Sequence, residues 1–201
     1  MKAILVFLKA ARPGFVKPGL ANNFGAERAT EVYRNLVRKT FAQFPSTVSV
    51  HIWFSPTDGE QEVRQLLSAF SSDDWIFLPQ PETDPASRRK IAFEYAFKRG
   101  YDKVLLVGTD CLDLHRGLLD ESWYWLDEQD IVVGPTEDGG YYLLGMRRFF
   151  PELFREIPWG TESTFEITME RASEMRRSCF ILTQLCDIDH IEDWDLIKDR
   201  L

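Results

Sequence analysis

Short apolar runs alternate with longer helical patterns along most of this chain of 201 residues. The runs are rich in β-branched and aromatic residues, which at these lengths predicts buried strands. The predicted strands cover residues 3–8, 47–54, 75–78, 103–107 and 130–133. Amphipathic segments that predict helices cover residues 26–44, 59–70, 86–99 and 116–128. This alternation predicts βαβ units and therefore a mostly parallel sheet with helices packed on it.

The alternation of strand and helix patterns ends after residue 133. The segment 134–140 (GPTEDGG) is a dense turn signal, and the segment 141–147 (YYLLGMR) has the composition of a further strand. Since no helix fits between these strands, we expect the second to run antiparallel to a neighbour, which makes the sheet mixed. A helix at 162–176, a strand at 179–185 and a short helix at 191–198 complete the prediction of one three-layer α/β/α domain over residues 1–201.

The charge and the cysteines exclude several classes of protein. The formal net charge is −8, and such a field repels phosphate backbones, so we expect no nucleic-acid partner. A small phosphorylated ligand is compatible with this charge, because a few lysines and a metal ion reverse the potential locally. The three cysteines form no disulfide or zinc pattern, and no apolar run has the length of a signal sequence or a membrane span. We therefore expect a cytoplasmic protein.

The loop after the first predicted strand, residues 9–20 (KAARPGFVKPGL), lies where open α/β sheets bind ligands, outside the carboxyl ends of the strands. It carries the cations Lys9, Arg12 and Lys17, whose charges suit phosphate oxygens. Its Gly14 lets the backbone approach a ligand closely. The loop matches neither a P-loop nor a dinucleotide-binding fingerprint. A solvated surface loop explains the same residues equally well, so both interpretations stay open at this point.

A second candidate site follows the strand predicted at 103–107. Asp110 lies just after this strand, and desolvating a lone carboxylate is costly, so Asp110 requires a partner. A magnesium or manganese ion bound to a diphosphate is one such partner, because hard cations take oxygen ligands. Capping of the next helix is the alternative. Cys111 is expected to be a small buried residue and not a nucleophile, since no histidine or basic cluster adjoins it.

The turn at 134–142 is the third candidate. Asp138 and Gly139 between two strands are first of all a turn signal. That interpretation leaves Gly140 and Tyr141 unexplained. Consecutive glycines beside an acid also suit close approach of the backbone to a substrate, so the turn has a structural and a functional interpretation.

The last candidates lie in the final third of the chain. The segment 187–194 (DIDHIEDW) is acidic and follows a predicted strand. Asp189 in this segment either caps the last helix or brings a second carboxylate to a metal held elsewhere. Trp159 either forms the wall of a pocket or belongs to the core.

These segments, in this order and spacing, resemble a bacterial family of small GT-A-like glycosyltransferases. The family (the DUF2064 type) belongs to the nucleotide-diphospho-sugar transferase superfamily and is related to the guanylyltransferases of cofactor F420 synthesis. Its three patterns are similar to F-x-K-A-P-x-P-G-x-V-K-T-R-L, G-S-D-C-P-D-L and G-P-x-x-D-G-G-Y-Y-L-x-G. This chain matches them at Phe7, Lys9, Ala10, Pro13, Gly14, Val16, Lys17 and Leu20, at Gly108, Asp110, Cys111, Asp113 and Leu114, and at Gly134, Pro135, Asp138, Gly139, Gly140, Tyr141, Tyr142, Leu143 and Gly145.

The resemblance implies a GT-A fold, a nucleotide site formed by the first loop and a divalent cation, Mg²⁺ or Mn²⁺. In the wider superfamily one metal ligand follows the central strand, which corresponds to Asp110 here. A second comes from the C-terminal acidic motif, which corresponds to Asp189. Trp159 also stands where the family has a tryptophan.

The chain departs from the family at several positions. Pro18 and Gly19 replace a threonine and an arginine, and Leu112 replaces a proline. An upstream motif similar to D-L-G-E-R-M is retained only at Arg89. Losing a phosphate-binding arginine removes a bidentate contact that a lysine does not reproduce, and Arg12 is a candidate to compensate. Weaker nucleotide binding, an altered donor and loss of catalysis are the open consequences.

The resulting hypothesis is a metal-dependent glycosyltransferase that uses a nucleotide-diphospho-sugar donor. Asp110 and Asp189 hold the metal ion, and Asp138 faces the acceptor as the base that takes a hydroxyl proton. The expected ligand-binding residues are Lys9, Arg12, Gly14, Lys17, Gly139, Gly140, Tyr141 and Trp159. One alternative is a nucleotidyltransferase that uses a nucleoside triphosphate and releases pyrophosphate. The other is a catalytically degenerate protein that binds nucleotides or sugar phosphates.

Overall fold

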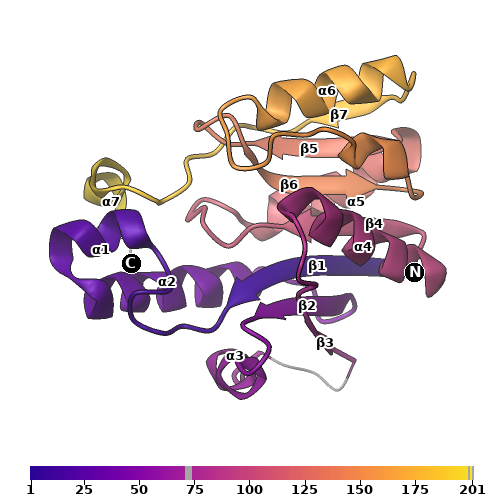
Figure 1. Ribbon diagram of the computed structural model, residues 1–201. Coiled ribbons are helices and arrows are strands. Elements are labelled where there is room, and N and C mark those ends of the chain that lie inside the picture. Colours follow the sequence, from indigo (N-terminus) through magenta and orange to yellow (C-terminus); the bar gives the residue numbers. More distant parts are fainter. Residues whose placement is uncertain (71–73, 199, 201) are drawn as a thin grey trace.

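The computed structural model describes residues 1–70, 74–198 and 200, which build one seven-stranded sheet (Figure 1). Its strands are β1 (Lys2–Lys9), β2 (Ser49–Ser55), β3 (Ile76–Pro79), β4 (Lys103–Val107), β5 (Ile131–Pro135), β6 (Tyr141–Met146) and β7 (Cys179–Ile181). Their order is β3-β2-β1-β4-β6-β5-β7. β6 runs antiparallel to both neighbours, and all other pairs are parallel. The mixed, mostly parallel sheet predicted from the sequence is therefore confirmed.

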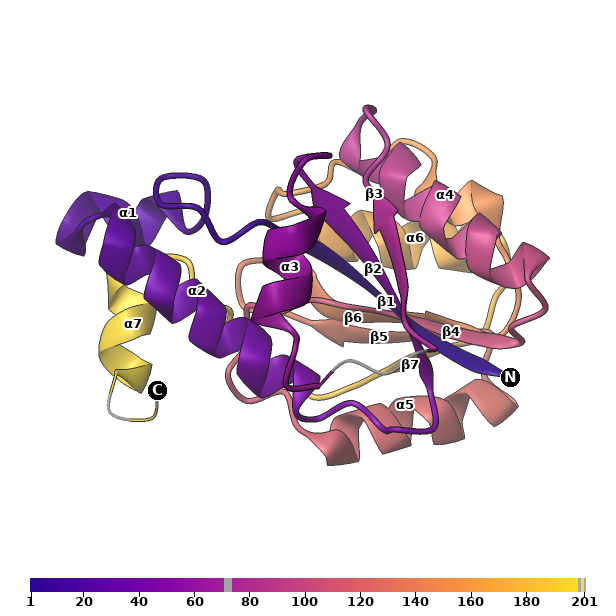
Figure 2. The ribbon, with the colours of Figure 1, turned by 90° about the horizontal axis from the view of Figure 1, so that it is seen from below.

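Helices cover both faces of the sheet (Figure 2). One face packs against α2 (Ala26–Phe41), α3 (Glu60–Leu66) and α5 (Arg116–Glu128), and the other against α4 (Pro85–Lys98), α6 (Thr164–Glu174) and the short 3₁₀ helix η1 (Pro151–Phe154). Side chains alternate between the faces along each strand, so Ile4 and Val6 join one apolar core and Leu5 joins the other. No helix in the described part of the chain is both long and apolar enough to cross a membrane.

Two further helices, α1 (Pro18–Phe24) and α7 (Ile191–Ile197), lie beyond the carboxyl end of β1 (Figure 1). They share a small apolar cluster with α2, in which Leu20 and Ile188 are buried and Phe24 contacts Trp194. The loop predicted over residues 9–20 includes the first turn of α1. The seven residues of this helix show no helical apolar period, and it begins with Pro18, which suits the first turn of a helix and also suits a turn.

The C-terminal strand is shorter than predicted, because β7 ends at Ile181 and not at Leu185. The chain nevertheless continues beside β5. The backbone N–H of Leu182 donates to Val133 at 2.8 Å, and that of Leu185 donates to Pro135 at 3.1 Å. This extension carries the acidic segment that follows it to the carboxyl edge of the sheet.

Candidate active site

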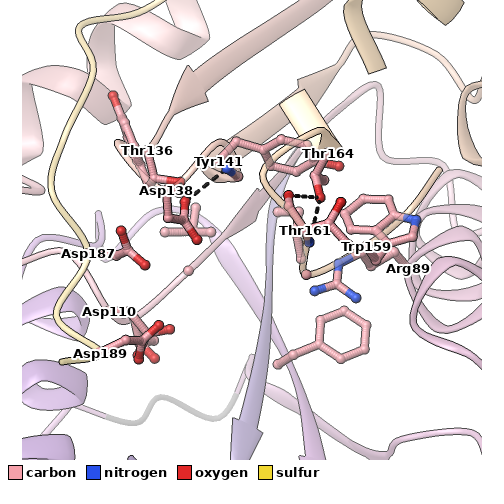
Figure 3. A pocket seen from close by; sticks show the side chains of 18 residues that line it. Arg89, Asp110, Thr136, Asp138, Tyr141, Trp159, Thr161, Thr164, Asp187 and Asp189 are labelled. Carbon is pink, nitrogen blue, oxygen red and sulfur yellow. Dashed lines mark hydrogen bonds between the residues drawn. The ribbon is translucent and has the colours of Figure 1, made fainter. Parts of the chain in front are cut away.

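The carboxyl ends of the central strands surround a cavity of about 260 Å³ (Figure 3). Its walls come from the end of β1, the loop after β4, the β5–β6 turn, the segment before α6, the acidic C-terminal segment and α4. The lining residues are Phe7, Arg89, Leu106, Val107, Gly108, Thr109, Asp110, Thr136, Asp138, Gly140, Tyr141, Tyr142, Trp159, Gly160, Thr161, Thr164, Asp187 and Asp189. A neighbouring hollow of about 210 Å³ shares four of these residues and adds Lys9, Val16, Lys17, Pro18 and Tyr33. The two hollows meet at Asp110 and Asp189.

Lys17 joins the two carboxylates that lie between the hollows. Its Nζ donates to Asp189 Oδ1 at 2.8 Å and also forms an ion pair with Asp110 Oδ1. The Lys17 side chain is 4% exposed, whereas those of Asp110 and Asp189 are 43% and 49% exposed. Burial alone lowers the pKa of Lys17, but attraction to the two carboxylates outweighs it, so the pKa is raised and the ammonium stays charged.

Backbone contacts bring together these two acids, which lie far apart in the sequence. The N–H of Ile188 donates to the carbonyl of Asp110 at 3.0 Å, and the Ile188 side chain is buried. On the other side, α1 packs so closely that a side-chain carbon on Gly19 would lie 2.4 Å from the Asp189 carbonyl oxygen. Gly19, which replaces the family's arginine, is therefore required here by packing.

Asp187 adds a further carboxylate to the cavity. Asp187 and Asp189 both line the cavity, while Ile188 between them packs into the apolar cluster under α1. Burial raises the pKa of Asp187 to about 7, and the nearby carboxylates of Asp138, Asp189 and Asp110 add to the effect. The acidic side of the cavity thus holds more negative charge than Lys17 neutralises.

The β5–β6 turn holds Asp138 in a fixed position. Asp138 Oδ1 accepts hydrogen bonds from Thr136 Oγ1 at 2.5 Å and from the backbone N–H of Gly140 at 2.8 Å. Oδ2 accepts none from the residues that the structure describes. One carboxylate oxygen therefore shapes the turn, and the other is available to a ligand.

Gly139 supports this turn from outside the cavity. It has φ +84°, and a side-chain carbon on it would lie 2.0 Å from the Glu162 carbonyl oxygen. Its own carbonyl accepts the N–H of Phe165 at 2.8 Å. The sequence predicts close approach of the glycine pair to a substrate. Gly139 instead approaches the chain before α6, whereas Gly140 lines the cavity, so the ligand-binding role of Gly139 stays a prediction.

The opposite end of the cavity is aromatic and positively charged. The guanidinium of Arg89, on α4, lies 4.3 Å from the ring centroid of Trp159 and 5.8 Å from that of Phe7. The rings of Tyr141 and Trp159 meet edge to face, with their centroids 5.4 Å apart. Figure 3 shows Arg89 and Trp159 across the cavity from the four aspartates.

The remaining predicted residues lie around the first loop. Lys9 lines the second hollow, and its backbone N–H and carbonyl both bond the Tyr33 hydroxyl, at 3.0 and 2.9 Å. Arg12 instead pairs with Glu62 at 2.6 Å, and Gly14 lies in an exposed turn with φ +83°. Neither lines the cavity or the second hollow, so the nucleotide-binding roles of Arg12 and Gly14 stay predictions.

Two charged residues of the cavity, Asp187 and Arg89, were absent from the predicted site. Asp187 was recoverable, because in an extended segment side chains two apart point the same way, so Asp189 implies Asp187. Arg89 was noticed only as a remnant of a degraded motif. No local signal shows that α4 directs this arginine at the carboxyl edge of the sheet.

The donor set fits a hard divalent cation. Asp110 and Asp189 already converge on one positive group, the Lys17 ammonium, and Asp187 lies beside them. No group of three or more acidic, histidine or cysteine side chains is arranged to hold a metal ion among the described residues. A magnesium ion takes only one or two carboxylates when substrate phosphates supply further ligands, so a pair of carboxylates is compatible with such an ion.

Comparisons with known proteins agree with this fold. Residues 40–161 match the family described as "Uncharacterized protein conserved in bacteria (DUF2064)". The crystal structure of a protein from Desulfovibrio desulfuricans G20, provisionally described as a nucleotide-diphospho-sugar transferase, is 30% identical. It aligns over 98% of this chain and 85% of its own, with a TM-score of 0.89. No curated protein matches the chain.

Two more distant structures share the fold. CMP:2-keto-3-deoxy-manno-octonic acid synthetase, complexed with CTP, has a TM-score of 0.59 and 11% identity over 98% of this chain and 97% of its own. Rv0371c from Mycobacterium tuberculosis H37Rv, in complex with manganese, has a TM-score of 0.57 and 12% identity over 100% of both chains.

Proposed function

The chain belongs to the DUF2064 family of bacterial proteins, and from its site we propose that it is a metal-dependent glycosyltransferase with a nucleotide-diphospho-sugar donor. Family membership agrees with the resemblance seen in the sequence. The observation that carries the proposal is the meeting of Asp110 and Asp189 beside Lys17, where two hollows join at the carboxyl edge of the sheet.

In this proposal the donor occupies the hollow beside the first loop. Lys9 and Lys17 line it, and their charges suit the diphosphate. The Arg12 guanidinium contributes only if it leaves Glu62. A protein with the same fold forms a complex with CTP, which supports a nucleotide as ligand, and open α/β sheets bind ligands at this edge.

Asp110 and Asp189 are the residues that would hold a magnesium or manganese ion with the diphosphate. When bound, the ion supplies positive charge for the oxygens of the leaving nucleotide. The manganese complex of a protein with the same fold supports this part of the proposal. Lys17 positions these two carboxylates, because its ammonium lies between them.

The larger cavity then receives the acceptor. Asp138 Oδ2 is the group proposed to take the proton of the acceptor hydroxyl, because the two hydrogen bonds to Oδ1 fix the carboxylate at the cavity wall. Gly140, Tyr141 and Trp159 shape the space around it.

Nucleotidyl transfer is the competing reaction, and the products separate the two. Glycosyl transfer releases a nucleoside diphosphate, whereas attack on a nucleoside triphosphate releases pyrophosphate. The first loop favours the former. Residues 9–20 contain only two glycines, Gly14 and Gly19, and their two prolines lack an N–H, so the loop offers fewer free backbone N–H groups than a glycine-rich triphosphate loop.

A thermal-shift screen of nucleotides and nucleotide-sugars, with and without Mn²⁺, tests the proposal, since ligands that bind the folded state raise its Tm. We expect a nucleotide-sugar to raise the Tm more with Mn²⁺ than without it. In Asp110→Asn the manganese-dependent part of the shift should vanish, and donor affinity should fall at least about tenfold.

Asp113→Asn is the matched control. Asp113 is on the same loop as Asp110 but pairs with Arg200 and does not line the cavity. It should keep the manganese-dependent shift. A wild-type protein that no nucleotide stabilises, with or without Mn²⁺, would overturn the proposed function.

A further inference from the structure

The proposed function leaves Arg89 without a role. Its guanidinium lines the larger cavity at the end opposite the four aspartates (Figure 3). It is stacked at 4.3 Å on Trp159, so its orientation is set by the aromatic wall. The one protein acceptor within hydrogen-bond reach, among the residues described, is the carbonyl of Pro85 in its own helix, 3.0 Å from Nη1.

Arg89 also lacks a counter-charge. No carboxylate of the described residues lies within 4.0 Å of its guanidinium. In contrast, Arg12, Arg147 and Arg171 each pair with an acid. Burial lowers the pKa of Arg89, yet a guanidinium stays protonated, so the cavity contains a partly desolvated positive charge without a partner.

The threonines around Arg89 make their hydrogen bonds within their own segment. The hydroxyls of Thr161 and Thr164 donate to the Pro158 carbonyl, at 2.8 and 2.9 Å, and accept backbone N–H groups of residues 161 and 163. The guanidinium of Arg89 thus keeps N–H donors that no described side chain accepts, and a ligand group that accepts hydrogen bonds and carries negative charge would complement them.

From these observations we propose that Arg89 binds an oxyanion, either a carboxylate or a phosphate, on the acceptor substrate. The inference rests on the proposed function, because it takes the larger cavity as the acceptor site. The acceptor is then a hydroxyl compound with an anionic group at one end. Arg89 holds that group, and the hydroxyl lies toward Asp138, so the charges along the cavity fix which hydroxyl meets the donor.

Isothermal titration with three small probes tests this proposal. Glycerol 3-phosphate, glycerate and glycerol share a three-carbon skeleton and differ in whether they carry a phosphate, a carboxylate or no charge. We expect the wild-type protein to bind at least one of the anions and to bind glycerol much more weakly. The preferred anion identifies the oxyanion as phosphate or carboxylate.

Variants assign the binding to Arg89. Arg89→Gln should weaken binding of the preferred anion at least about tenfold, and Arg89→Lys should be intermediate because it keeps the charge but loses the planar fork. Arg99→Gln is the control, since Arg99 stacks on Tyr95 at 4.4 Å outside the cavity and should leave anion binding unchanged. Thermal unfolding of each variant verifies that it is folded.

The outcomes separate this inference from the proposed function. If neither anion binds the wild type, if glycerol binds as well as the anions, or if Arg89→Gln binds the anions as tightly as the wild type, the inference is wrong. Nucleotide binding with Mn²⁺ is measured on the same samples and should be unchanged in Arg89→Gln. Loss of nucleotide binding in the wild type would refute the donor assignment, while an anion site that depends on Arg89 would still stand.

Discussion

The carboxyl edge of the sheet and the middle of β2 both bury a titratable side chain, but the first stabilises its charged form and the second its neutral form. At the edge, Lys17 is 4% exposed, pairs with Asp110 and Asp189, and has a raised pKa. In β2, His51 is fully buried, neither ring nitrogen has a hydrogen-bond partner, and burial lowers its pKa to about 4, with Arg99 adding to the effect.

The difference shows that burial alone does not decide whether a side chain is charged. At the edge, loops and helix ends bring polar groups together, so a buried cation finds acids from distant segments. Inside the sheet His51 meets the edges of Tyr95 and Tyr101, which supply no negative charge, and the nearby cation Arg99 opposes protonation, so the imidazole stays neutral. Function therefore concentrates at the edge, where charge is stabilised.

The largest effect is expected from the tight packing at the edge. Gly139→Ala places a methyl group 2.0 Å from the Glu162 carbonyl oxygen in a left-handed backbone, and should lower the free energy of unfolding by about 4 kcal/mol. Gly14→Ala is the matched control, because Gly14 has nearly the same φ, +83°, with nothing within 4 Å. It should cost about 1 kcal/mol. Urea unfolding measures both, and equal losses would show that the turn is not tightly packed.

Removing the buried cation should have the next largest effect. Lys17→Met leaves Asp110 and Asp189 facing each other without a counter-charge, and should lower the free energy of unfolding by about 2–3 kcal/mol. This is less than for a fully buried pair, since both carboxylates are nearly half exposed. Lys9→Met, at an exposed lysine, should have little effect on the urea midpoint. A Lys17→Met protein as stable as the wild type would show that the buried Lys17 does not stabilise the carboxyl edge of the sheet.

The neutral, buried His51 predicts that the stability of the folded protein depends on pH. His51 titrates near 6.5 in the unfolded chain and at about 4 in the folded protein. Between these values the unfolded state binds more protons, so stability falls as the pH drops from about 6.5 to about 4 and this loss then stops. The loss attributable to His51 should reach at most about 3 kcal/mol.

Unfolding experiments at several pH values, on the wild type and on His51→Leu, measure this contribution. The variant should lose less stability on acidification, whatever its stability at neutral pH. His115→Asn, at an exposed histidine, is the control and should keep the wild-type slope. Identical slopes in wild type and His51→Leu would show that His51 is not held neutral.

Much of the fold was predictable because its signals are local. The β-branched strand at β4, the amphipathic pattern of α2 and the turn at Asp138 each follow from neighbouring residues. The helix α1 was missed, because its apolar residues contact α2 and the acidic segment, which lie elsewhere in the sequence. A local sequence pattern identifies helices and strands that have an apolar period of their own. It misses those, such as α1, that are stabilised by contacts with distant segments.

The same division holds for the site. The sequence by itself determined which residues can carry charge at the carboxyl edge, Lys17, Asp110 and Asp189 among them, because strand ends and loops are marked by composition. Only the tertiary structure decided that Lys17 lies between the two acids, that Gly139 is held against Glu162 and that Arg89 enters the cavity. Such pairings join segments far apart along the chain, and the path of the folded backbone selects them.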